Sequence, residues 1–207
     1  MQALRKEKTL EIKRFVGGSL ESNCYIINKQ SKGECYIIDP GYEPQRTIKY
    51  VEDNSLTVKG IILTHYHHDH VGGVPKISDY FECPVMMSFE DSLRYKGKTD
   101  ICLKHGDTIV MDGEILNIVR TPGHTKGSIC IISDASKVVF TGDTIFDTDL
   151  GRTDFEDGSD EEMIWSCKNI IDKWPNEYRI YPGHDESATM KQVRTYNKEF
   201  LQCLETD

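Results

Sequence analysis

The sequence predicts an α/β (α+β) fold in which two packed sheets are flanked by helices, within a single domain spanning residues 1–207. Two observations lead to this prediction. Strands and helices fall into two halves, and each half has a meander or hairpin of strands with helices after it. No linker rich in glycine, proline or serine separates the halves, and no sequence repeat of fixed period is present.

In the first half, short apolar runs bounded by turn residues predict strands. These runs are residues 10–16, 24–27, 35–38, 58–63 and 84–87. Asp39-Pro40-Gly41 ends the third strand, because proline and glycine interrupt a ladder. Helices are expected at residues 43–53, 74–80 and 90–95, the first with Pro44 tolerated in its first turn.

In the second half, two hairpins precede a helix, a last strand and a last helix. The expected strands are residues 108–111, 115–119, 128–132, 138–140 and 178–181. Asp112-Gly113 is a hairpin turn signal between the first two. Helices are expected at residues 159–172, where Ser159 is a suitable N-cap, and at residues 190–204.

The composition limits the partners and the location. A formal charge of −9 argues against a nucleic-acid partner, which needs basic surface. No apolar run approaches the length of a membrane span, and the charged segment Met1–Glu11 lacks the apolar core of a signal peptide. A cytoplasmic location without membrane partners is therefore expected. The seven cysteines are scattered and form no CxxC pair, which predicts reduced, mostly buried thiols.

The densest cluster of candidate functional side chains is Thr64-His65-Tyr66-His67-His68-Asp69-His70. It follows an apolar strand and precedes a glycine pair, so it lies at the carboxyl end of that strand. Imidazole and carboxylate are standard ligands of zinc and similar metals. Two histidines two residues apart, His65 and His67, can reach one metal, while Asp69 and His70 turn towards a second.

Three later turns each present one polar side chain after a strand. They are Pro122-Gly123-His124, Gly142-Asp143 and Pro182-Gly183-His184. Each turn alone is a weak signal, because such turns are usually surface turns. Together with the dense cluster they supply seven ligands, which is the number suited to two metals.

The order His-x-His-x-Asp-His, Gly-His, Gly-Asp and Gly-His resembles the metallo-β-lactamase superfamily over essentially the whole chain. The resemblance implies an αββα sandwich with the site at the sheet edges. It implies two divalent metals, zinc first, with iron or manganese as alternatives. The implied ligands are His65, His67 and His124 for site 1, Asp69, His70 and His184 for site 2, and Asp143 as the bridge.

The same resemblance implies that a metal-bound hydroxide is the nucleophile, and that Asp69 orients it or takes its proton. Two further histidines fall outside the implied ligand set. His68 is expected to point away from the metals, and His105 is expected in a turn.

Residues 142–146 and 151–155 resemble the glyoxalase II (hydroxyacylglutathione hydrolase) group. That resemblance implies a thioester substrate such as S-lactoylglutathione, possibly another glutathione conjugate, with Arg152 binding the glutathione. An ion pair is an equally good interpretation of Arg152. The chain ends at Asp207 with room for one helix after His184, so it resembles the short, single-domain branch of the group.

Two other activities remain open at this point. One is a persulfide dioxygenase with a single iron on His65, His124 and Asp143, since those enzymes share the stretch Gly151-Arg152-Thr153-Asp154-Phe155. The other is lactone hydrolysis. In each case the partner is a small molecule, and an acidic domain of this size is compatible with a monomer or a dimer.

Overall fold

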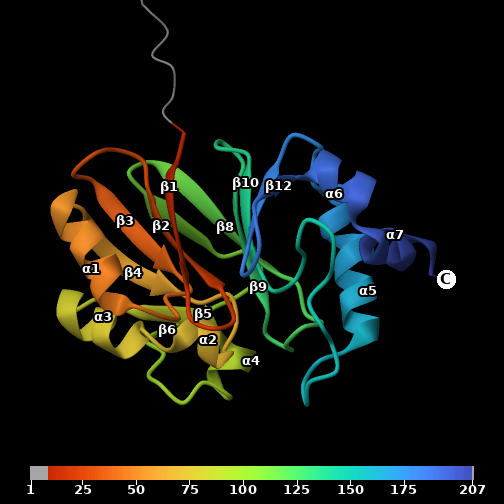
Figure 1. Ribbon diagram of the computed structural model, residues 1–207, viewed down its shortest axis with the longest axis horizontal. Helices are drawn as coiled ribbons and strands as arrows, with labels where there is room; N and C mark the ends of the chain where they lie inside the picture. The colour runs from red at the N-terminus through yellow and green to blue at the C-terminus, as the bar shows by residue number, and fades with distance from the viewer. Residues whose placement is uncertain (1–8, 207) are drawn as a thin grey trace, which may run out of the picture.

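The computed structural model describes residues 9–206 of the chain. Two six-stranded sheets pack face to face, with one set of helices outside each (Figure 1). Helices α1 and α3 cover the first sheet, and helices α5, α6 and α7 cover the second (Figure 1). The predicted fold class, two mixed sheets flanked by helices, is confirmed.

The first sheet has the strand order β1-β2-β3-β4-β5-β6. Its strands are Glu11–Gly17, Ser22–Asn28, Glu34–Ile38, Thr57–Ile62, Val85–Ser88 and Ile101–Leu103. Strands β1 to β3 form an antiparallel meander, and β3 to β6 run parallel. The helices of this half are α1 (Pro44–Asp53), α2 (His68–Val71), α3 (Val74–Phe81) and α4 (Phe89–Ser92).

The second sheet has the strand order β12-β11-β10-β9-β8-β7. Its strands, from β7 to β12, are Thr108–Met111, Glu114–Arg120, Ile129–Ser133, Val138–Gly142, Arg179–Pro182 and Ala188–Thr189. Neighbours are antiparallel except β10 and β11, which are parallel. The helices of this half are α5 (Asp160–Asn169), the 3₁₀ helix η1 (Ile171–Lys173), α6 (Met190–Tyr196) and α7 (Lys198–Glu205).

Three buried clusters form the core, one between the sheets and one under each set of helices. Burial on both faces explains why β2, β9 and β10 are near-continuous apolar runs rather than alternating ones. Between the sheets, the ring of Tyr25 meets Phe140 edge to face at 5.3 Å, and Tyr181 stacks on Phe140 at 5.4 Å. These aromatic contacts join the sheets beneath the edge that carries the candidate site.

The structure corrects several expected elements. Strands β6 and β12 were missed, because three-residue and two-residue segments carry no readable alternation. The expected helix at 90–95 is one turn, α4, and the helix at 159–172 ends at Asn169 before η1. The expected helix at 190–204 is two helices, so the expectation of room for one helix after His184 is wrong.

Asn197 causes the break between α6 and α7. Its side-chain carbonyl accepts a hydrogen bond from the backbone N–H of Phe200 and so caps α7. Its amide group donates to the carbonyl oxygens of Phe146 and Asp149 at 3.1 and 2.8 Å. The side chain of Asn197 is fully buried and makes all three of these hydrogen bonds, so it stabilises the break relative to a continuous helix.

Within residues 9–206, none of the helices combines the length and apolar character needed to cross a membrane. The seven cysteines are free thiols, and five of them are buried. The expectation for the N-terminal segment concerns residues 1–11, most of which lie outside the described residues.

Candidate metal centre

The candidate ligands lie at the carboxyl ends of four strands. His65 and His67 follow β4 in the first sheet. In the second sheet, His124 follows β8, Asp143 follows β10 and His184 follows β11. Strands β8 and β10 are both antiparallel to β9, and β10 is parallel to β11, so their carboxyl ends share one edge. The strand directions therefore gather distant residues at one edge of the sandwich.

The first ligand group is His65, His67 and His124, whose candidate ligand atoms all lie within 4.8 Å of one another. Nδ1 of His67 is 2.9 Å from Nε2 of His124. His65 and His124 are only 1% and 3% exposed. Three imidazole nitrogens this close together could provide three of the four ligands of a tetrahedral metal site.

The second ligand group is Asp69, His70 and His184. The first two belong to α2, the single turn of helix that begins within the histidine cluster. Oδ2 of Asp69 lies 3.3 Å from Nε2 of His70 and 3.2 Å from Nε2 of His184. A helical turn at this point separates Asp69 and His70 from the first two histidines and directs them to a second position.

Asp143 lies between the two groups. Its carboxylate is 3.4 Å from Nε2 of both His70 and His184, 3.5 Å from Nε2 of His124 and 3.8 Å from Nε2 of His65. This is the placement that a bridging carboxylate needs, and the assignment of the seven side chains as ligands stays a prediction. His68, in contrast, has a side chain that is 80% exposed.

Gly142 brings Asp143 into this position. Its φ of +49° lies in the left-handed region, and a Cβ there would approach Oγ1 of Thr64 to 2.3 Å. The glycine lets the β10 turn pack directly against the loop that carries His65. His105 lies outside both groups, in the turn between β6 and β7, where its Nδ1 accepts from the Arg120 N–H at 3.3 Å.

Hydrogen bonds orient the first group's imidazoles. Nδ1 of His124 donates to the carbonyl oxygen of Arg152 at 2.7 Å. Nδ1 of His65 is 3.1 Å from Oγ1 of Thr64, whose own proton goes to Asp39, so this imidazole nitrogen is the donor. In both rings Nδ1 carries the proton, and Nε2 therefore presents its lone pair to the centre.

In the second group, a hydrogen bond orients His184 and an ion pair orients His70. Nδ1 of His184 donates to the carbonyl oxygen of Leu20 at 2.9 Å. Nδ1 of His70 lies 3.3 Å from Oδ2 of Asp39, a buried carboxylate that also accepts from the backbone and side chain of Thr64. From the sequence, Asp39 was expected only to end a strand. Its position could have indicated a role at the site, because Asp39 stands before Pro40-Gly41 at the end of β3, and β3 lies beside β4.

Burial lowers the pKa of every imidazole in the first group. Desolvation by burial is the main cause for His65, His67 and His124, and neighbouring histidines add to it. The pKa of His67 falls to about 4. These rings are therefore neutral at physiological pH, which is the form that binds a metal.

The second group has the opposite electrostatics in the metal-free protein. Burial disfavours the charged forms, but the carboxylates of Asp143 and Asp69 outweigh it and raise the pKa of His70, and that of His184 to about 10. The same contacts hold the pKa of both carboxyls well below its usual range. In the metal-free protein, the protonated imidazoles of His70 and His184 thus balance the negative charge of the two carboxylates, which a bound metal would otherwise balance.

Several polar atoms of the centre have no hydrogen-bond partner among residues 9–206 although they are buried. They are Nε2 of His65, Nε2 of His70 and Oδ1 of Asp143. Nδ1 of His70 also lacks a hydrogen bond, but it faces the Asp39 carboxylate at ion-pair distance. Buried polar atoms without partners are costly, and metal ligands are a common reason for them. A set of imidazole nitrogens and carboxylate oxygens suits zinc, iron or manganese. The residues present therefore fit a divalent metal centre.

A cavity of about 510 Å³ opens over the two ligand groups. Its wall is apolar at Leu20, Phe146, Leu150 and Phe155. Arg152 also lines it, with an exposed guanidinium that pairs with both carboxylate oxygens of Asp154 at 2.7 and 2.8 Å and lies 4.5 Å from the Phe155 ring. The ion-pair interpretation of its side chain thus matches the structure, while its backbone carbonyl orients His124.

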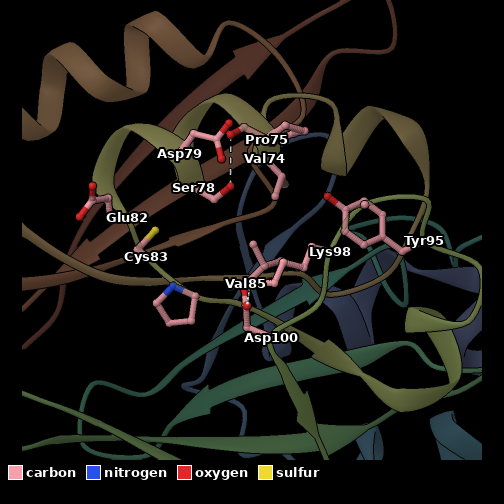
Figure 2. A pocket seen from close by; sticks show the side chains of 12 residues that line it. Val74, Pro75, Ser78, Asp79, Glu82, Cys83, Val85, Tyr95, Lys98 and Asp100 are labelled. Carbon is pink, nitrogen blue, oxygen red and sulfur yellow. Dashed lines mark hydrogen bonds and ion pairs between the residues drawn. The ribbon is translucent and has the colours of Figure 1, made fainter.

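A second hollow of about 810 Å³ lies beside α3 (Figure 2). Side chains of α3 and of the segment that follows α4 face one another across it, including Ser78, Tyr95 and Lys98 (Figure 2). Cys83 lines it, but burial raises the pKa of this thiol to about 11. A protonated thiol is a poor nucleophile, so Cys83 is not a candidate nucleophile in this hollow.

Comparisons with known proteins agree with this geometry. The family model for the metallo-β-lactamase superfamily matches residues 17–184. Hydroxyacylglutathione hydrolase GloC of Haemophilus influenzae is 30% identical and covers 86% of this chain and 92% of its own length. A relative from Aquifex aeolicus is 31% identical over 90% of this chain and 95% of its own length.

Among solved structures, the BLEG-1 B3 metallo-β-lactamase superposes with a TM-score of 0.84 at 25% identity, over 91% of this chain and 98% of that one. The family match spans all seven candidate ligands, from the histidine cluster to His184. Fold, ligand order and sequence similarity lead to the same assignment. The chain belongs to the metallo-β-lactamase superfamily.

Proposed function

We propose that the protein is a metal-dependent hydrolase that cleaves thioesters such as S-lactoylglutathione. The observation that carries this proposal is the pair of ligand groups with Asp143 between them, at the floor of an open cavity. The similarity to a hydroxyacylglutathione hydrolase over most of both chains supports the choice of thioester.

In this proposal His65, His67 and His124 hold one metal, Asp69, His70 and His184 hold the other, and Asp143 bridges them. Zinc is the proposed metal, with iron or manganese as alternatives. When bound, such ions act as Lewis acids on a carbonyl and lower the pKa of water towards neutrality.

The chain's own contribution is to position the reactants. Asp69 is held by two imidazole contacts and by its backbone carbonyl, which accepts from the Ser22 hydroxyl at 2.8 Å. Because these contacts fix the position of its carboxylate, we assign it the role of orienting the attacking water. The attack breaks the carbon–sulfur bond, and the proton of the water leaves with the thiol.

The cavity wall suits a small acyl thioester. Leu20, Phe146 and Phe155 provide apolar contacts around the reacting centre. Arg152 stands at the rim and can bind a carboxylate of the thiol carrier, at the expense of its ion pair with Asp154. The partner in this proposal is a small molecule, and the free thiols suit a reducing compartment such as the cytoplasm.

A persulfide dioxygenase is the second candidate. Oδ2 of Asp143 lies 3.8 Å from Nε2 of His65 and 3.5 Å from Nε2 of His124. Two histidines and one carboxylate are a set that binds a single iron with open positions. The second group, with His70 and His184 on the other side of the same carboxylate, favours two metals and therefore the hydrolase.

Three measurements on the purified protein decide between these activities. We expect hydrolysis of S-lactoylglutathione, no oxygen uptake with glutathione persulfide, and a metal content near two zinc ions per chain. Oxygen uptake without thioester cleavage, together with one iron per chain, would establish the dioxygenase instead. A lactone in the same assay tests whether the site prefers an oxygen ester.

A further inference from the structure

Asp91 is a buried carboxylate outside the ligand set. It lies in the single-turn helix α4 of the first half and is 1% exposed. Its contacts reach loops that follow strands of both sheets. An ionised carboxylate is costly to bury unless hydrogen bonds satisfy it. The groups that donate to Asp91 therefore indicate its structural role.

Both carboxylate oxygens of Asp91 accept hydrogen bonds from these loops. Oδ2 accepts from the backbone N–H of Tyr66 at 3.1 Å and from Oγ1 of Thr125 at 2.8 Å. Oδ1 accepts from the backbone N–H of Gly127 at 2.7 Å. One side chain therefore connects the loop after β4 to the loop after β8.

These partners are the chain neighbours of the three histidines in the first ligand group. Tyr66 stands between His65 and His67, and Thr125 follows His124 directly. We propose that Asp91 is a positioning residue that sets the spacing of this three-histidine group, and with it the affinity of the group for metal. The inference depends on the metal centre and is independent of which substrate the protein cleaves.

The packing around Asp91 leaves its carboxylate little freedom. A Cβ on Gly127 would lie 2.3 Å from Oδ1 and 2.6 Å from the backbone nitrogen of Asp91, so only glycine allows this approach. That backbone nitrogen donates to Oγ of Ser88, the N-cap of α4. The hydroxyl of Ser128 adds a contact of 2.7 Å to Thr125.

Burial raises the pKa of Asp91 to about 6, against the hydrogen bonds from Thr125 and Gly127, which lower it. The group is therefore ionised at neutral pH. An asparagine has the same shape but only one acceptor oxygen. In either orientation of the amide, its NH₂ group faces an N–H or O–H group that now donates to Asp91, so at least one hydrogen bond is lost. We therefore expect Asp91→Asn to separate the two loops without creating a cavity.

The test measures zinc affinity, by competition against a chromogenic chelator, and the melting temperature of the metal-free protein. Removing a group that holds metal ligands in position weakens metal binding about 10- to 100-fold, which is the loss we expect for Asp91→Asn. The matched control is Glu114→Gln at the other end of β8. Glu114 is equally buried, forms an ion pair with Lys29 at 2.8 Å and accepts from Ser136 at 2.7 Å, and none of these contacts involves a candidate ligand.

The control separates positioning from general destabilisation. We expect Glu114→Gln to lower the melting temperature but to keep zinc affinity within about twofold of the wild type. If Asp91→Asn also keeps its affinity within that range, or if the control loses as much, the proposal is overturned.

A second pair of variants covers the case in which Asp91→Asn does not fold. Thr125→Val removes the hydroxyl donor at nearly constant volume, whereas Thr125→Ser keeps it. We expect the valine variant to bind zinc several-fold more weakly and the serine variant to bind like the wild type. Equal affinities in these two variants would overturn the proposal.

Discussion

At the scale of single residues, Asp143 faces histidines of both ligand groups at 3.4–3.8 Å. This carboxylate places negative charge among four imidazoles that lie close together, since the ring of His65 is 4.3 Å from that of His70 and 4.9 Å from that of His124. Residues such as Arg152 and Leu20 act on the same histidines through their carbonyl oxygens, so their side-chain identity matters less for metal binding.

Replacing Asp143 by alanine is expected to abolish thioester hydrolysis and to reduce the metal content below two ions per chain, because the bridge is lost. Asp154→Ala, which removes an exposed carboxylate beside the cavity, serves as the control and should keep its metal. Elemental analysis and initial rates measure both. Full metal content and rate in Asp143→Ala would show that it is not a ligand.

His184 predicts how the stability of the metal-free protein depends on pH. Its pKa is raised from 6.5 to about 10 in the folded chain, so protonation stabilises the fold. That contribution is complete below about pH 6.5 and is lost as the pH rises towards 10. Urea unfolding of chelator-treated protein across this window should show falling stability, with a weaker fall in His184→Asn. Identical slopes would contradict the assignment.

At the scale of elements, the segment after β10 forms one wall of the cavity, and the C-terminal helices hold it. Asn197 donates to the carbonyls of Phe146 and Asp149, and Glu199 accepts from the N–H of Leu150 at 2.8 Å. The break between α6 and α7 thus places two polar side chains, Asn197 and Glu199, against the loop that lines the cavity. Their hydrogen bonds hold this loop in position.

Arg152→Ala is expected to raise KM for glutathione thioesters with a modest loss of kcat, because the proposed function places the guanidinium against a part of the substrate remote from the reacting carbonyl. The backbone carbonyl that orients His124 remains, so metal content should be unchanged. Arg46→Ala removes another exposed, ion-paired arginine, in α1, and is the control. An unchanged KM in Arg152→Ala would assign this arginine a structural role.

At the scale of the whole molecule, the candidate metal centre draws its residues from both halves of the sandwich. His65, His67, Asp69 and His70 come from the first half, while His124, Asp143 and His184 come from the second. A ligand that binds only the folded arrangement stabilises the protein by mass action. Metal binding should therefore stabilise the packing of one sheet on the other.

Zinc at a free concentration about 100 times its dissociation constant should stabilise the fold by about 2.7 kcal/mol. For a chain of this size that corresponds to a rise in Tm of about 5–10 °C, and a chelator should reverse it. Thermal unfolding with and without zinc measures the effect. Asp143→Ala should show a smaller rise, and an equal rise would place the stabilising metal elsewhere.

Much of this molecule was predictable from local sequence. The hairpin at Asp112-Gly113, the helix after Gly73 and ten of the twelve strands follow from turn chemistry and from apolar runs, which act over a few residues. The expected ligand residues were also readable, because the histidine cluster follows a strand and each of the three later candidates follows a glycine at the end of a strand. Strand direction then brings such turns to one edge.

Other features were decided only by tertiary structure, because they depend on contacts between residues far apart in the chain. Asp39 meets His70, Asp91 meets Thr125, and Asn197 meets Phe146 across separations of 31, 34 and 51 residues. An isolated aspartate or asparagine has the same local signature in a turn as in a buried network. The chain by itself therefore determined its fold class and the candidates for its metal site, whereas folding decided which buried polar groups hold that site in shape.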